Sequence, residues 1–220
     1  MVKLPKSFWL IAPFATWIAL MTVLPATVGG YAVRAAATAA MLAAGWRQGL
    51  KTIDLRRKPC LPSHVSSPLA SFVSRLKSSL LPGLLVGLAV FAVWILPEQL
   101  DWAWYRKWCI IGEGGTQTVA EASAVMIAIR LIGSAFVISV AEELFFRKWL
   151  IGFAGFWWMV GLFAIEHDRW LVAAICGIAY GALYLRRGLG AAIVAHATTN
   201  LVLGLWVLRT GQWQFGNVVL

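Results

Sequence analysis

Residues 140–150 read VAEELFFRKWL and set two adjacent carboxylates, Glu142 and Glu143, and a guanidinium, Arg147, at the end of a long apolar run. Ionisable side chains at bilayer depth are expensive to desolvate, so their presence there indicates a function. On a helix, Glu143 and Arg147 are spaced i,i+4 and can pair on one face, whereas Glu142 points about 100° away. We therefore expect the arginine to neutralise one glutamate and the other glutamate to remain available for chemistry.

The composition is typical of a membrane protein. Of the 220 residues, 60% are hydrophobic and 13% are charged, and the mean hydropathy is +0.78. Repeated long apolar segments predict an all-α fold, a polytopic transmembrane helical bundle with about seven (6–8) membrane helices. We expect a single integral membrane domain over residues 1–220, with residues 118–208 as the core that carries the catalytic motifs. The expected membrane helices cover residues 7–24, 31–46, 80–96, 152–165, 171–185 and 189–208, and a further one over residues 118–141 leads into the glutamate-bearing stretch 140–150.

Positive charge is concentrated in the loops and at the helix ends. The formal net charge is +10, which in a soluble protein would suggest a nucleic-acid partner. Residues 46–80 contain seven Lys or Arg residues and one acidic residue, Asp54. The positive-inside rule makes this segment a basic cytoplasmic loop, and the N-terminus is then cytoplasmic as well. We expect the loop to contact anionic lipid, with an acidic partner as the alternative, and we expect no nucleic-acid partner.

Cysteine usage and short motifs argue against several kinds of site. The three cysteines, Cys60, Cys109 and Cys176, are far apart and form no CxxC pair, so neither a disulfide framework nor a zinc knuckle is indicated. The sequence contains no serine in a G-x-S-x-G setting and no HExxH, so serine hydrolases of that type and zincins lack their motif. A nucleophile built on serine or cysteine is therefore poorly supported.

Two further polar patterns interrupt later apolar segments. Phe163 and His167 lie in the stretch LFAIEH, and His196 and Asn200 bound the stretch HATTN. A lone histidine on an apolar helix is more often a packing residue than a catalytic one. Here, however, two histidines, an asparagine and the two glutamates lie on separate hydrophobic helices, and each needs a polar partner in hydrocarbon. These side chains are best satisfied if they meet in one cavity.

The chemistry available to such a cavity is hydrolytic. A carboxylate and an imidazole together can deprotonate a water molecule. A neighbouring histidine and asparagine can donate hydrogen bonds to the oxyanion that forms when the water attacks a carbonyl. The residues therefore indicate hydrolysis of an amide or ester by an activated water, without identifying which amide.

The order and spacing of the three motifs resemble the CPBP family, which groups CAAX prenyl endopeptidases with bacteriocin-processing and immunity-associated proteins. The family pattern is EExxxR, then FxxxH, then HxxxN or HxxxD on successive membrane helices. This chain has EELFFR from Glu142, FAIEH from Phe163 and HATTN from His196, so the resemblance covers roughly its C-terminal half. The chain is also similar to a small bacterial branch of CAAX-protease-related proteins that accompany exosortase sorting systems.

The resemblance implies a glutamate-dependent intramembrane endopeptidase that needs no metal or other cofactor. Glu142 would be the base, with His167 helping it to activate the water, and His196 and Asn200 would form the oxyanion site. Supporting roles in ordering the helix and packing beneath the histidine are implied for Glu143, Arg147 and Phe163.

The implied partner is a peptide or protein substrate that enters from the membrane or from the cytoplasmic side. The expected location is the inner (plasma) membrane of a bacterium, where a peptide or sorting tail is a more plausible substrate than a prenylated protein. Two alternatives remain open. One is a non-catalytic membrane scaffold or immunity-type protein that binds a peptide or partner in the same cavity. The other is a metal-dependent hydrolase with Glu142, His167 and His196 as ligands.

Overall fold

The computed structural model describes residues 4–25, 27–48, 50, 79–111 and 124–215. Every regular element within these ranges is helical, so the predicted all-α class is confirmed. Besides the long helix that carries the paired glutamates, the helices are α1 (Lys6–Val23), α2 (Val28–Gln48), α4 (Leu81–Gln99), α5 (Ala103–Cys109), α9 (Phe156–Ile165), α10 (Trp170–Arg187) and α11 (Leu189–Thr210), followed by a short 3-10 turn, η6 (Trp213–Phe215).

Three of the described helices, α1, α4 and α11, are long and apolar enough to cross a membrane, and α9 is apolar but shorter. This finding supports an integral membrane protein, whereas the number of about seven membrane helices and their orientation stay predictions. The third predicted helix is longer than expected, because α4 continues through Pro97 to Gln99 instead of ending at the proline.

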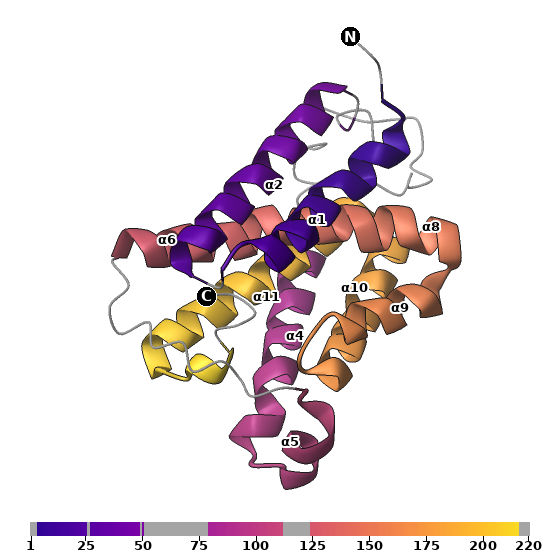
Figure 1. Cartoon of the computed structure of the whole chain (residues 1–220). Coiled ribbons are helices and arrows are strands. Elements are labelled where there is room, and N and C mark those ends of the chain that lie inside the picture. Colours follow the sequence, from indigo (N-terminus) through magenta and orange to yellow (C-terminus); the bar gives the residue numbers. More distant parts are fainter. Residues whose placement is uncertain (1–3, 26, 49, 51–78, 112–123, 216–220) are drawn as a thin grey trace, which may run out of the picture.

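The paired glutamates lie within one long helix. α6 (Ala124–Ile132) continues through the π-helical segment η4 (Gly133–Ile138), α7 (Ser139–Glu142) and the π-helical segment η5 (Glu143–Leu150) into α8 (Ile151–Ala154). The residues at each junction keep right-handed helical dihedral angles. In Figure 1 this helix runs behind α1 and α2, and α9 and α10 lie near its α8 end. π-helical turns within α-helices are frequent at functional sites.

Gly155 ends the long helix, which corrects one predicted boundary. The long helix extends to Ala154, and the helix predicted over residues 152–165 begins only at Phe156. Gly155 has φ 95° and ψ 170°. Glycine adopts such a conformation without the steric penalty of a side chain, so the chain turns here from one helix into the next.

α11 is the central helix, and it packs against α4, α10 and η4. The approach of α4 is close, because a Cβ atom placed on Gly87 would lie 2.5 Å from the carbonyl oxygen of Ala195 and 2.7 Å from Cβ of Thr198. The hydroxyl of Thr199 donates to the carbonyl oxygen of Gly87 at 2.9 Å. Small residues allow such close contacts between membrane helices, and this contact fixes the histidine-bearing part of α11 against α4.

The basic loop predicted at residues 46–80, together with its expected contact with anionic lipid, lies largely outside the described residues, because residues 51–78 are not described.

Candidate active site

The two adjacent glutamates lie close to the same imidazole. His196 Nδ1 is 2.9 Å from Glu143 Oε1, and His196 Nε2 is 3.8 Å from Glu142 Oε2. All three side chains are buried. A separation of 3.8 Å is too long for a hydrogen bond, and Oε2 of Glu142 has no hydrogen-bond partner within the described part of the chain. The second glutamate of the pair therefore holds the histidine, and the first presents an uncommitted carboxylate oxygen beside it.

The predicted pairing of Glu143 with Arg147 is present, although the segment is π-helical. Arg147 Nε lies 3.2 Å from Glu143 Oε2, and both side chains are fully buried. The guanidinium carbon is 4.2 Å from the ring centroid of Phe163 and 5.4 Å from that of Tyr180. Aromatic faces attract cations in a desolvated site. The arginine thus compensates the charge of Glu143 and anchors it beneath the histidine.

His167 follows the end of α9, and the backbone sets its tautomer. His167 Nδ1 donates to the carbonyl oxygen of Phe163 at 2.8 Å, since a carbonyl can only accept. In the neutral ring, Nε2 then carries the lone pair. The imidazole centroid is 4.6 Å from the ring of Phe163 and 5.7 Å from that of Trp94. His167 therefore offers a hydrogen-bond acceptor held between two aromatic rings.

The turn that carries His167 is attached to the end of α4 by a buried ion pair. Arg169 Nε lies 2.6 Å from Glu98 Oε1, and the two side chains are 2% and 10% exposed. On the other side of the turn, the backbone N–H of Ile111 donates to the carbonyl oxygen of Asp168 at 2.7 Å. These contacts hold the residues next to the histidine in place.

Asn200 connects α11 to the first π-helical segment of the long helix. Its Nδ2 donates to the carbonyl oxygen of Ser134 at 3.2 Å and to Oγ of Ser139 at 3.1 Å. The hydroxyl of Ser139 in turn donates to the carbonyl oxygen of Ser134 at 3.0 Å. The two contacts use both amide protons of Asn200, so the side chain would have to release one of them to donate to an oxyanion.

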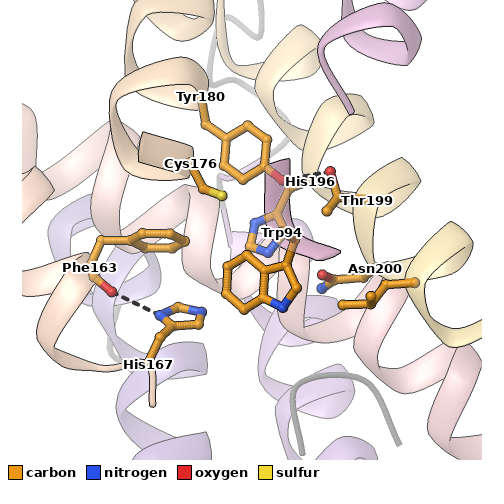
Figure 2. Close-up of a pocket in the computed structure, with 9 residues that line it drawn as sticks. Trp94, Phe163, His167, Cys176, Tyr180, His196, Thr199 and Asn200 are labelled. Carbon is orange, nitrogen blue, oxygen red and sulfur yellow. Dashed lines mark hydrogen bonds between the residues drawn. The ribbon is translucent and has the colours of Figure 1, made fainter. Parts of the chain in front are cut away.

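Both histidines and Asn200 line one small cavity, whose volume is about 10 Å³. A site of this size accommodates about one water molecule. Figure 2 shows the side chains from α4, α9, α10 and α11, and from the turn after α9, that converge on it. The lining residues are Trp94, Phe163, His167, Cys176, Tyr180, His196, Thr199, Asn200 and Leu203. His196 thus joins the cavity to the two glutamates, which contact its ring nitrogens.

Several cavity residues were not predicted from the sequence. The ring of Tyr180 stacks on His196, with centroids 5.0 Å apart and an interplanar angle of 20°. Its hydroxyl donates to Thr199 Oγ1 at 2.7 Å. An aromatic residue in an apolar helix is typical of a packing residue, and the same holds for Trp94. For Tyr180, the hydroxyl was the one available signal, because a buried tyrosine hydroxyl usually has a polar partner.

The polar side chains of the site are suited to proton transfer. Among the residues that the structure describes, no group of three or more His, Cys, Asp or Glu side chains is arranged to hold a metal ion. The site instead combines a carboxylate oxygen without a hydrogen-bond partner, an imidazole hydrogen-bonded to a second carboxylate, and an imidazole of fixed tautomer.

Comparison with known proteins relates this site to one family. Residues 123–202 match the family model described as type II CAAX prenyl endopeptidase Rce1-like. The matched segment runs from the start of the long helix into α11 and contains all seven site residues named from the sequence, so the resemblance drawn from the motifs is confirmed for this segment. No curated protein and no solved structure matched the chain.

Proposed function

We propose that the protein is an intramembrane endopeptidase that hydrolyses a peptide bond with an activated water, as the match of residues 123–202 to the Rce1-like type II CAAX prenyl endopeptidases suggests. The observation that carries the proposal is the meeting of Glu142, Glu143 and His196 beside a water-sized cavity that His167 also lines. These residues come from segments far apart in the sequence, and packing alone does not require ionisable groups in an apolar bundle.

In the proposed reaction, Glu142 is the general base. Its Oε2 and His196 Nε2 are 3.8 Å apart, a separation at which one water oxygen between them can bridge both groups. Glu142 takes a proton from this water as the oxygen attacks the scissile carbonyl carbon, and later returns it to the departing amine. His167, whose Nε2 accepts hydrogen bonds, helps to orient and deprotonate the water.

His196 is proposed to stabilise the oxyanion, with Asn200 as the second predicted donor. The contact of Nδ1 with Glu143 supports the first role, because it orients the ring so that Nε2 faces Glu142, beside which the attacked carbonyl would lie. For Asn200 the role requires the exchange of one of its bonds to Ser134 or Ser139. Until that exchange, Asn200 keeps α11 in register with the long helix.

The substrate is proposed to be a peptide or protein segment that reaches the cavity from the membrane or the cytoplasmic side. The apolar lengths of α1, α4 and α11 support a membrane location, and the distribution of Lys and Arg in the sequence supports a cytoplasmic N-terminus. The proposed membrane is the bacterial inner membrane that the family resemblance implies. Anionic lipid at residues 46–80 remains part of the proposal on the same charge argument.

The test is cleavage of a peptide library by the purified full chain in detergent micelles. Glu142→Gln keeps the shape of the side chain and removes the base, so we expect cleavage to fall at least about 1,000-fold. Asp101→Asn is the matched control, because it also turns a carboxylate into an amide, but at an exposed residue that pairs with Arg106 outside the cavity. This variant should cleave normally. Cleavage by Glu142→Gln at the rate of the wild type would contradict the proposal.

The non-catalytic alternative has a different outcome in the same experiment. A scaffold or immunity-type protein would cleave no peptide in the library, and its biological activity would survive both Glu142→Gln and His196→Ala. A metal-dependent hydrolase would lose cleavage on exhaustive chelation, whereas the proposed mechanism predicts that cleavage persists.

A further inference from the structure

Trp94 is a cavity residue that no motif includes. It belongs to α4, outside the segment that matches the family, and its side chain is 4% exposed. Its indole Nε1 has no hydrogen-bond partner among the described residues. A buried N–H without a partner is unfavourable, and in a site of defined chemistry it marks a donor held for a ligand. In Figure 2 the indole lies between the labelled His167 and Asn200.

The other polar donors around the cavity are engaged by the protein itself. Nδ1 of His167 donates to a backbone carbonyl, and Nδ1 of His196 contacts Glu143. Both amide protons of Asn200 are directed to serine oxygens. The Tyr180 hydroxyl donates to Thr199.

The one hydroxyl proton of Thr199 is in turn shared between two carbonyl oxygens, that of Gly87 at 2.9 Å from Oγ1 and that of Ala195 at 3.1 Å. Apart from the thiol of Cys176, which is a weak donor, the cavity-lining donor that the described chain leaves uncommitted in every protonation state of the histidines is therefore the indole N–H of Trp94.

We propose that Trp94 is a catalytic residue whose indole N–H donates a hydrogen bond to the oxygen of the scissile carbonyl as it becomes an oxyanion. This inference rests on the proposed peptidase function. When the water oxygen bonds to the carbonyl carbon, the π electron pair moves onto the carbonyl oxygen, and the water proton passes to Glu142. When the C–N bond breaks, the amine takes that proton and the carbonyl re-forms. Trp94 holds the oxygen through both steps without transferring its own proton.

The packing around Trp94 suits a preorganised donor. Its ring meets the imidazole of His167 nearly edge to face, with centroids 5.7 Å apart and an interplanar angle of 72°. Two helical turns earlier, Gly87 brings α4 against the backbone of α11. A donor that is already fixed needs little reorganisation during the reaction, which is how oxyanion sites lower the barrier.

The first experiment compares Trp94→Phe with the matched control Trp9→Phe, using the full chain in micelles and a peptide that the wild type cleaves. Trp9 also has a buried indole nitrogen without a hydrogen-bond partner among the described residues, but it packs away from the cavity against Leu50, Leu144 and Leu189. We expect kcat to fall about 100-fold in Trp94→Phe with little change in KM. Trp9→Phe should keep the wild-type kcat, and Trp94→His, which restores a ring N–H, should recover part of the loss.

A second measurement separates a hydrogen bond from a packing effect. The peptide is compared with its thioamide analogue, in which sulfur replaces the oxygen of the scissile carbonyl and accepts hydrogen bonds more weakly. The ratio of kcat for the peptide to kcat for its thioamide analogue should be larger in the wild type than in Trp94→Phe. Trp94→Leu, which also has no side-chain N–H, serves the same comparison if the phenylalanine variant does not fold.

An equal oxygen-to-sulfur ratio in the wild type and the variant would overturn the role of Trp94, and so would an unchanged kcat in Trp94→Phe. Either result leaves the endopeptidase proposal standing as long as cleavage still depends on Glu142. Absence of any Glu142-dependent cleavage by the wild type would overturn both proposals together.

Discussion

Replacing Gly87 with alanine tests the close packing of α4 on α11. The added Cβ would lie 2.5 Å from the carbonyl oxygen of Ala195 and 2.7 Å from Cβ of Thr198. Ordinary van der Waals contact begins near 3.4 Å, so one helix must move away from the other. The nearest obstacle is backbone, which cannot rotate aside, and the hydrogen bond from Thr199 to the Gly87 carbonyl lies in the same contact.

The size of the effect follows from two opposing terms. Overpacking a well-filled interior costs about 1–3 kcal/mol, whereas alanine favours a helix over glycine by up to about 1 kcal/mol. We expect Gly87→Ala to lower the free energy of unfolding by about 1–2 kcal/mol. Gly161 is the matched control, because it also lies within a helix, α9, and a Cβ atom added there would have no atom within 4 Å. Gly161→Ala should be neutral or stabilising by up to about 1 kcal/mol.

The measurement is equilibrium unfolding of the two variants in mixed micelles, followed by circular dichroism. Displacement of α4 would also move Trp94 and disturb the hydrogen bond from Thr199 of α11 to the Gly87 carbonyl, so the cleavage rate of Gly87→Ala should fall while that of Gly161→Ala should not. Equal stability changes in the two variants, or a stabilised Gly87→Ala, would refute the packing argument.

Two further substitutions probe the buried ion pairs. Arg147→Ala should lower the free energy of unfolding by about 3–5 kcal/mol, because it removes one partner of a fully buried ion pair and leaves Glu143 without it. Unfolding in micelles measures this change, and a loss below about 1 kcal/mol would contradict the stabilising role of the pair. Glu98→Ala should lower the cleavage rate by loosening the turn after His167, whereas Asp101→Ala, which breaks an exposed pair with Arg106, should change stability by less than about 1 kcal/mol and leave cleavage intact. Equal cleavage rates in these last two variants would contradict the positioning role of the Glu98 pair.

Much of the helical framework follows from apolar periodicity. α1, α10 and α11 lie close to their predicted ranges, because long apolar runs bounded by polar residues leave few alternatives in a bilayer. The pairing of Glu143 with Arg147 was also predictable, since i,i+4 side chains are neighbours in any right-handed helix of similar pitch. These features depend on residues that are close in sequence.

Other features depend on tertiary contacts that periodicity does not encode. The 100° separation of Glu142 and Glu143 predicted different surroundings, yet both reach the ring of His196 where the helix changes from α7 to η5. The sequence of η4 contains no motif that predicts a π-helical segment or a polar contact. Asn200, which donates to this segment, lies in α11, more than sixty positions away in the sequence. The roles of Trp94 and Tyr180 could not be predicted from the sequence for the same reason. Each role depends on the side chains that the residue contacts in the folded structure.

The most direct test of the central claim is a double-mutant cycle on kcat with Glu142→Gln, His196→Gln and the combined variant. If the two side chains act as a unit at one reaction centre, the double variant should lose no more activity than about the more damaging single variant. Multiplication of the two single losses in the double variant would show that the residues act independently, and it would contradict the shared reaction centre.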